Sequence, residues 1–313
     1  MLEDIGFYTL CDYRARQCSV SSPLWRCELL VTSRCNFNCT YCRGTSMKAD
    51  ISYEGARSVV QEWIMHDIRH VRFSGGEPTM VPWLADLVRE CRDADVWRIA
   101  VSTNGSAPMH VYDRLLTAGV NDFSISLDAC CAATGETMTG RSGMWRTVCD
   151  TIRILARETY VTVGVVVTPV NVAELPSTIR FASECLGVAD IRIIPASQWG
   201  PRMPVPDVPM RILMRHPILR YRMRRLSEGA TVRGIGIDDN HRCPLAVDDM
   251  AVLGNKHYPC IIALREGAPP IGHVGPTMRE DRAEWVRQHD TFADPICRNN
   301  CLDVCVEYNN TVW

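Results

Sequence analysis

Lysine is scarce in this sequence of 313 residues, and so is net charge. Lys48 and Lys256 are the two lysines, although Lys and Arg together number 34, so nearly every basic side chain is an arginine. The formal net charge is −2, which argues against the strongly basic surface that binds nucleic acids or anionic membranes. We therefore predict no nucleic-acid partner and no membrane partner.

Long apolar runs and targeting segments are also lacking. No apolar stretch approaches the length that crosses a bilayer. Residues Met1–Gly6 have neither the cationic nor the apolar region of a signal peptide, so we expect a cytoplasmic protein. The hydrophobic content is 46%, which is enough for one large α/β domain with a smaller appendage.

Cysteine, by contrast, is abundant, with 16 residues. In a reducing compartment, grouped cysteines are more often metal ligands than disulfides. One group follows the strand-like run 29–32 with C-x3-C-x2-C spacing, and its members are Cys35, Cys39 and Cys42. Three thiolates in one short loop can hold an iron–sulfur cluster that takes its fourth ligand from elsewhere, and a zinc knuckle is the alternative.

Strand-like and helix-like segments alternate about six times between residues 26 and 195. The predicted strands are 26–32, 71–73, 98–103, 122–127, 161–167 and 191–194, and the predicted helices are 53–66, 81–94, 112–118, 143–158 and 173–186. This alternation predicts a parallel sheet with right-handed crossovers. A partial barrel and a doubly wound open sheet both fit, and in either the working edge is the carboxyl end of the strands.

The alternation stops near residue 195, and this divides the chain. We predict an N-terminal lead (1–25), a barrel (26–195), a linker with a basic helix (196–230) and a cluster-binding domain (231–313). The last segment has little apolar periodicity and carries a second cysteine group, which comprises Cys243, Cys260, Cys297, Cys301 and Cys305. A metal centre would stabilise a segment that lacks its own core.

The early cysteine loop with Tyr41, and the sequence Gly75-Gly76-Glu77-Pro78 after a predicted strand, resemble the radical S-adenosylmethionine (radical SAM) superfamily and its SPASM/twitch subgroup. The resemblance implies a partial (β/α)6 TIM-like barrel with a small C-terminal twitch/SPASM-like domain. It implies a [4Fe-4S] cluster on the three early cysteines, with SAM bound to it. The implied SAM-binding residues are Tyr41, Gly75, Gly76, Glu77, Pro78, Ser102, Asn104, Ser126, Arg141 and Val167.

The late cysteines resemble the site of one auxiliary [4Fe-4S] cluster, although a C-x2-C pair is commoner in the family at this point. The implied ligands are Cys243, Cys297, Cys301 and Cys305. Five thiols exceed four ligands by one, and we take Cys260 as the candidate hydrogen-atom donor. The alternatives are that Cys260 is itself a ligand, that the spare thiol is inert, and that the site holds zinc.

The resemblance implies chemistry in which a 5′-deoxyadenosyl radical removes hydrogen from the substrate, with flavodoxin or ferredoxin as reductant. The chain is similar to aminoglycoside-tailoring members, so we expect redox-neutral epimerisation of a sugar carbon. The acidic residues expected to line a site for this cationic substrate are Asp128, Asp238-Asp239, Asp248-Asp249 and Glu280-Asp281. Radical dehydrogenation, peptide modification and a non-catalytic metal protein are the alternatives.

Overall fold

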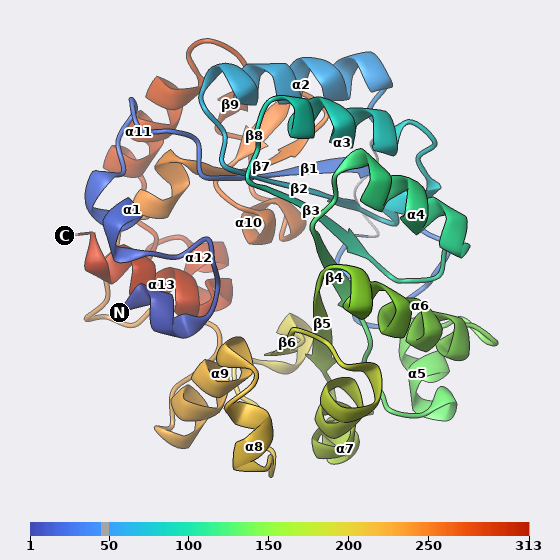
Figure 1. Ribbon diagram of the computed structural model, residues 1–313. Helices are drawn as coiled ribbons and strands as arrows, with labels where there is room; N and C mark the ends of the chain where they lie inside the picture. Colours follow the sequence, from blue (N-terminus) through green and yellow to red (C-terminus); the bar gives the residue numbers. More distant parts are fainter. Residues whose placement is uncertain (45–49, 313) are drawn as a thin grey trace.

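The computed structural model describes residues 1–44 and 50–312, and its centre is a nine-stranded sheet. Six strands pair in parallel in the order β6-β5-β4-β3-β2-β1. They are β1 (Arg26–Thr32), β2 (His70–Gly75), β3 (Arg98–Thr103), β4 (Asp122–Ser126), β5 (Tyr160–Val167) and β6 (Asp190–Pro195). The expected α/β class with a parallel sheet is confirmed. The sheet curves into an open wall with helices on its outer side (Figure 1).

The outer helices alternate with the strands along the chain. They are α2 (Tyr53–Met65), α3 (Leu84–Asp93), α4 (Met109–Ala118), α6 (Trp145–Glu158) and α7 (Leu175–Arg180), the last continued by a π-helical turn, Phe181–Leu186. Each buries one apolar face against the sheet, as Val59, Val60 and Trp63 of α2 do. One further helix, α5 (Ala132–Thr139), was not predicted, because its sequence is rich in threonine and glycine and has no apolar stripe.

The last quarter of the chain extends the same sheet. Strand β7 (Asp249–Leu253) pairs in parallel with β1, and β8 (Lys256–Tyr258) and β9 (Gly272–His273) follow in antiparallel order. Four helices accompany them: α10 (Ile261–Arg265), α11 (Met278–Gln288), α12 (Pro295–Asn300) and α13 (Asp303–Thr311). The weak apolar periodicity of residues 231–313 did not predict these short elements, and β7 is held in the sheet by pairing with β1.

The N-terminal lead packs against the C-terminal helices. It contains a 3-10 turn (Leu2–Ile5) and α1 (Asp12–Gln17), and α1 lies against α13, so the two ends of the chain are neighbours (Figure 1). A small separate core joins these parts, and its largest buried side chains are those of Tyr221 and Tyr308.

The basic segment predicted as one helix is two, α8 (Met210–Leu213) and α9 (Pro217–Ser227). Pro217 has no amide hydrogen to continue the first helix, but it suits the first turn of the second. None of the helices in the described ranges is both long and apolar enough to cross a membrane.

Candidate radical SAM site

The early cysteine loop leaves the carboxyl end of β1 and stands at the rim of the barrel. Cys35 and Cys42 are exposed, Cys39 is half-buried, and all three are free thiols. Backbone N–H groups point at two of the sulfurs, from Phe37 to Cys35 Sγ (3.4 Å) and from Gly44 to Cys42 Sγ (3.4 Å). Hydrogen bonds to sulfur favour the thiolate and tune an iron–sulfur cluster. The loop therefore fits a cluster bound by three thiolates.

Two glycines at the end of β2 allow the cysteine loop to lie against the sheet. A Cβ on Gly75 would lie 2.2 Å from the Thr32 carbonyl oxygen, and one on Gly76 would lie 2.2 Å from the Arg34 carbonyl oxygen. The Gly76 N–H donates to Thr32 O and the Glu77 N–H donates to Arg34 O, both at 2.8 Å. Any side chain at these positions would force β2 away from the loop.

The Glu77 carboxylate is buried and turned toward β3. It accepts hydrogen bonds from the Thr103 hydroxyl (2.7 Å), the Asn104 backbone N–H (2.7 Å) and the Thr79 hydroxyl (2.6 Å). Burial raises its pKa above the ordinary value. In this arrangement Glu77 joins the ends of β2 and β3, which fixes the position of Asn104 at the rim.

Tyr41 ties the same loop to the other side of the barrel. Its hydroxyl donates to Asp128 Oδ2 (2.5 Å), and Asp128 Oδ1 accepts from the Val166 backbone N–H (2.8 Å). Burial raises the pKa of Asp128 to about 6. The loop is thus held by β2 on one side and by the segment after β4 on the other.

A cavity of about 360 Å³ opens inside the barrel next to the loop. Nine of the predicted site residues line it: Cys35, Cys39, Tyr41, Cys42, Gly75, Gly76, Ser102, Asn104 and Ser126. Arg141 is exposed in the turn after α5. In β5, Val166 faces the cavity, whereas Val167 points to the other face of the strand and is buried. Pro78 is buried behind the turn. All these SAM contacts stay predictions.

Charged residues on the barrel wall were not predicted as part of the site. The cavity is lined by one carboxylate, Glu28, and by five arginines: Arg43, Arg72, Arg192, Arg233 and Arg265. The sequence did contain a signal, since Glu28, Arg72 and Arg192 each stand between two apolar residues inside a strand. A charge at such a position can avoid the core only by facing a cavity.

The fold brings the five late cysteines together although they are far apart in sequence. Cys243 precedes a 3-10 turn (Pro244–Val247), Cys260 caps α10, and Cys297, Cys301 and Cys305 lie on or beside α12 and α13. Burial raises the pKa of Cys243 to about 12, and the neighbouring Cys260 and Cys305 raise it further. N–H groups again point at sulfur, from Asn309 to Cys243 (3.5 Å) and from Ala263 to Cys260 (3.4 Å). This donor set suits a cluster, and its ligand assignment stays a prediction.

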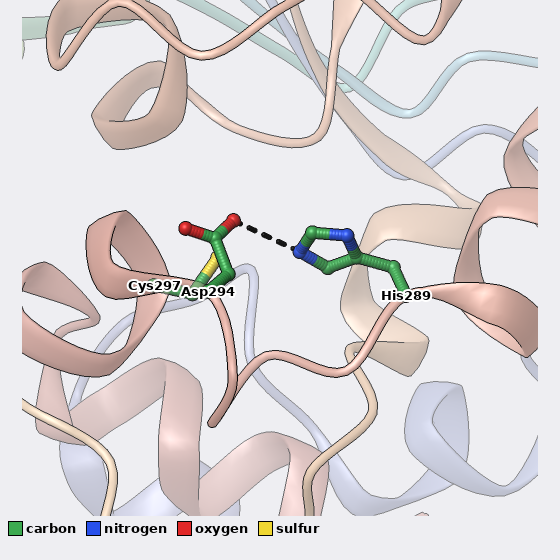
Figure 2. A group of neighbouring side chains, drawn as sticks. All are labelled: His289, Asp294 and Cys297. Carbon is green, nitrogen blue, oxygen red and sulfur yellow. Dashed lines mark hydrogen bonds and ion pairs between the residues drawn. The ribbon is translucent and has the colours of Figure 1, made fainter.

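A group of three side chains at the edge of these cysteines suits a single metal ion. The ligand atoms of His289, Asp294 and Cys297 lie within 4.8 Å of one another, and His289 Nε2 is 2.9 Å from Asp294 Oδ2 (Figure 2). Zinc accepts such nitrogen, oxygen and sulfur ligands. The zinc alternative therefore has a structural counterpart, although the other four late cysteines lie outside it.

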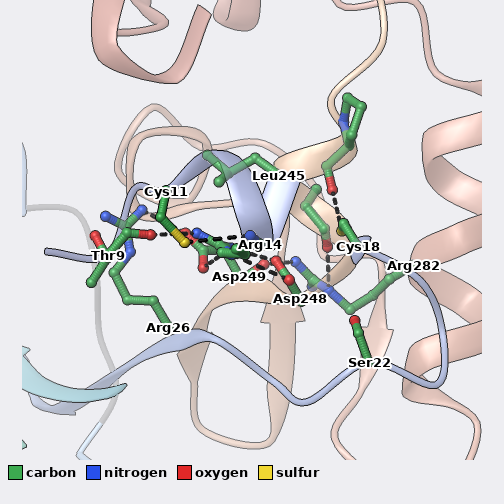
Figure 3. Close-up of polar contacts among 12 residues, drawn as sticks. Thr9, Cys11, Arg14, Cys18, Ser22, Arg26, Leu245, Asp248, Asp249 and Arg282 are labelled. Carbon is green, nitrogen blue, oxygen red and sulfur yellow. Dashed lines mark hydrogen bonds and ion pairs between the residues drawn. The ribbon is translucent and has the colours of Figure 1, made fainter. Parts of the chain in front are cut away.

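The acidic pairs expected to receive a cationic substrate lie elsewhere. Asp248 and Asp249 are buried and bind Arg14, and Asp249 also binds Arg26 at 2.7 Å (Figure 3). The remaining acidic pairs, Asp238-Asp239 and Glu280-Asp281, do not line the cavity, and neither does Asp128. That part of the prediction was wrong, because the one buried pair, Asp248 and Asp249, is engaged in internal ion pairs instead.

Comparison with known proteins agrees with this geometry. The model of the Radical SAM superfamily matches residues 29–182, the part of the chain that holds the cysteine loop and the glycine pair. This part of the chain is a radical SAM domain. The structure of anSMEcpe with bound AdoMet shares its fold (TM-score 0.61, 14% identity, 85% of this chain and 80% of that one). So does SuiB of Streptococcus suis (TM-score 0.60, 13% identity, 83% and 65%).

Curated relatives of the radical SAM domain have diverse activities. A probable GTP 3′,8-cyclase of Metallosphaera sedula is 28% identical over 178 residues, which is 55% of this chain and 56% of that protein. An AdoMet-dependent heme synthase of Methanosarcina barkeri is 27% identical over 165 residues, 51% of this chain and 47% of that protein. The chain thus spans about half the length of the curated relatives it matches, and the match identifies the domain rather than a substrate.

Proposed function

We propose that the chain is a radical SAM enzyme that removes a hydrogen atom from a substrate bound in the barrel. Cys35, Cys39 and Cys42 hold a [4Fe-4S] cluster in this proposal, and SAM binds across the carboxyl ends of β1 to β4. When bound and reduced, the cluster supplies an electron that releases a 5′-deoxyadenosyl radical from SAM. The observation that carries the proposal is that three free thiols, the glycine pair and the polar strand ends line one cavity.

The chain's own residues position these groups and limit the access of water. Glu77 and the glycine pair hold the loop against β2 and β3, while Tyr41 and Asp128 hold it against the opposite wall. The Gln198 side chain donates to the Tyr41 carbonyl (3.0 Å), so the segment after β6 also contacts the loop. A radical reaction needs such rigid placement, because the reacting hydrogen must lie next to the radical and away from other donors.

The test is anaerobic reconstitution with iron and sulfide, followed by iron analysis and detection of 5′-deoxyadenosine after reduction. A single cluster corresponds to about four irons per chain and two clusters to about eight. The triple variant Cys35→Ala, Cys39→Ala, Cys42→Ala should lose about four irons and all 5′-deoxyadenosine. Cys185→Ala is a matched control, since Cys185 is exposed and lies outside both cysteine groups. Wild-type protein that forms no 5′-deoxyadenosine would contradict the proposal.

We also propose an auxiliary [4Fe-4S] cluster on Cys243, Cys297, Cys301 and Cys305, in line with the five late thiols that share one region. Zinc bound at His289, Asp294 and Cys297 is the competing assignment. Metal analysis of the His289→Ala variant separates them. Loss of zinc with iron unchanged favours the zinc site, and about eight irons without zinc favours the cluster.

Redox-neutral epimerisation is a second candidate, and the position of Cys260 favours it. Cys260 is not itself among the residues that line the cavity, but it immediately precedes Ile261 and Ile262, which are. In this step the substrate carbon loses a hydrogen atom to the adenosyl radical and receives one from the Cys260 thiol, and one electron from a flavodoxin or ferredoxin and one proton from water restore the thiol. A product made in deuterated water would gain one deuterium, whereas dehydrogenation would remove two hydrogens. The Cys260→Ala variant should cleave SAM without forming the epimer.

A cationic aminoglycoside has no support among the residues that line the cavity. Glu28 is the one carboxylate in that lining, and its Oε1 accepts a hydrogen bond from the Ser74 hydroxyl at 2.5 Å. Peptide modification, which is suggested by the structure of SuiB bound to precursor peptide SuiA, rests on likeness of fold alone. The charge of the cavity is the better guide to the substrate.

A further inference from the structure

Three arginines converge inside the barrel without carboxylate partners. Arg72 comes from β2, Arg192 from β6 on the far edge of the parallel strands, and Arg265 from the end of α10, and all three line the cavity. Across residues 1–44 and 50–312, no carboxylate oxygen lies within 4.0 Å of a guanidinium nitrogen of these three residues. Of the five arginines that are buried, Arg14 and Arg222 have carboxylate partners. The other three, Arg233, Arg279 and Arg282, donate to backbone carbonyl oxygens instead, and Arg233 does so although it also lines the cavity.

Few of their hydrogen-bond donors are used. Each guanidinium carries five N–H donors. Arg72 donates to the Ser102 hydroxyl (3.2 Å) and Arg192 makes a long contact to the Ser124 hydroxyl (3.5 Å). The Nε atoms of Arg192 and Arg265 are buried and have no hydrogen-bond partner in the described part of the chain. A buried, unpaired donor on a charged group is costly unless a ligand completes it.

The three charges also act on one another. Burial and the neighbouring charges of Arg72 and Arg265 lower the pKa of Arg192 to about 10, although Glu28 and Asp122 act in the opposite direction. Like charges held together at this depth indicate that a counter-charge enters the cavity.

The cofactors do not supply that counter-charge. SAM carries a net positive charge, and it balances the net negative charge of an oxidised [4Fe-4S] cluster held by three thiolates. The missing negative charge is therefore expected on the substrate.

We propose that Arg72, Arg192 and Arg265 bind an anionic group of the substrate, a carboxylate or a phosphate, inside the barrel. That the anion belongs to a substrate rests on the proposed function. The arginine site itself is a feature of the chain and does not depend on that function. Guanidinium groups suit both anions, because their planar donors match the oxygens two at a time. A positive cavity would also attract such a substrate and repel a cationic one.

The test is calorimetric titration of the reconstituted full-length protein with inorganic phosphate and, separately, with malonate. We expect one of the two to bind with an affinity that falls as salt rises. The anion that binds more tightly shows whether the site is suited to a phosphate or to a carboxylate group of the substrate. Arg192→Gln and Arg265→Gln should each weaken its binding about tenfold or more, while Arg220→Gln, at an exposed position of α9, should not.

A second readout does not depend on ligand binding. Without phosphate or carboxylate in the buffer, Arg192→Gln should melt at a temperature equal to or above that of the wild type, because the variant relieves repulsion among buried charges. A structural role for Arg192 predicts a lower melting temperature instead and would overturn the proposal.

Two further results would also overturn it. One is wild-type protein that binds neither anion at millimolar concentrations. The other is an equal loss of affinity for SAM in Arg192→Gln, because the guanidinium would then serve the carboxylate of SAM. Iron content and 5′-deoxyadenosine formation by the wild type, measured on the same preparation, report on the proposed function separately.

Discussion

The glycine pair that joins the cysteine loop to β2 yields a sharp prediction. Gly76→Ala places a Cβ where the Arg34 carbonyl oxygen now lies, at 2.2 Å, whereas ordinary contacts begin at 3.4 Å. Either β2 or the loop has to move, and the hydrogen bonds from Gly76 N–H to Thr32 O and from Glu77 N–H to Arg34 O are stretched. Overpacking costs about 1–3 kcal/mol, and each weakened hydrogen bond adds about 1 kcal/mol. We expect a loss of about 2–5 kcal/mol in the free energy of unfolding.

Two matched variants separate the overlap from backbone strain. Gly187→Ala tests strain alone, because Gly187 has a φ of +70° and a Cβ there would meet no atom within 4 Å. Its cost of about 1–2 kcal/mol for the left-handed conformation is partly offset by the lower entropy of the unfolded chain, about 0.4–1 kcal/mol. Gly75→Ala combines both effects, with a φ of +146° and an overlap of 2.2 Å with Thr32 O. The expected order of stability is Gly187→Ala, then Gly76→Ala, then Gly75→Ala.

The assay is urea unfolding of the iron-free protein, followed by iron analysis after reconstitution. Gly76→Ala and Gly75→Ala should also retain less iron than the wild type, because the loop that carries the thiols is displaced, whereas Gly187→Ala should retain as much. If Gly76→Ala unfolds at the same urea concentration as Gly187→Ala and takes up the full amount of iron, the close approach of β2 to the loop is not what positions the cysteines.

Three other predictions concern the supports of the barrel. Tyr41→Phe removes the hydrogen bond to Asp128 and should cost about 1–3 kcal/mol, with faster loss of iron to a chelator. Arg14→Met leaves Asp248 as an unpaired buried carboxylate, whereas Asp249 keeps its ion pair with Arg26, and should cost about 3–5 kcal/mol in urea unfolding. Burial raises the pKa of Asp190 from 3.8 to about 6. The native carboxyl therefore binds a proton that the unfolded chain does not, so this contribution is present below about pH 4 and lost as pH rises through about 6. In Asp190→Asn that pH-dependent component, about 3 kcal/mol, should disappear.

Each of these has its own control. Tyr13→Phe, at an exposed tyrosine, should leave iron retention unchanged, and equal retention in the Tyr41 variant would contradict the anchoring role of that hydroxyl. Arg215→Met, at an exposed arginine, should cost under about 0.5 kcal/mol, and a similar value for Arg14→Met would mean that its ion pairs contribute little. Unfolding measured at several pH values checks Asp190, and identical pH profiles for wild type and Asp190→Asn would refute the shifted pKa.

Local sequence patterns predicted the barrel strands well because those strands are buried on both sides. Strand β3 was predicted with the same bounds, and β5 differs by one residue. The late strands were missed because their stability comes from pairing with β1, a partner more than two hundred residues away. The continuous basic helix was wrong because Pro217 interrupts it, a local signal that the apolar periodicity concealed.

The site shows the same division at the level of single side chains. The cysteine spacing and the Gly-Gly-Glu sequence identified the rim of the cavity, since both are short-range patterns with a specific chemistry. The acidic pairs misled because sequence alone does not show that Arg14 reaches Asp248. Sequence alone did not show that Val166 rather than Val167 lines the cavity, because the face of a strand is settled by its register, and a shift of one residue exchanges the two faces.

The sequence by itself determined the main architecture of this protein, which is a parallel α/β barrel with three thiols in a loop after its first strand. Spacing along the chain carries that information, because neighbouring residues in a loop or strand stay neighbours in any fold. Only the tertiary structure decided which charges line the cavity, because Arg72, Arg192 and Arg265 come from three distant elements. Their charges converge only because the sheet curves and α10 packs inside it. Without that curvature, the three guanidinium groups would lie far apart.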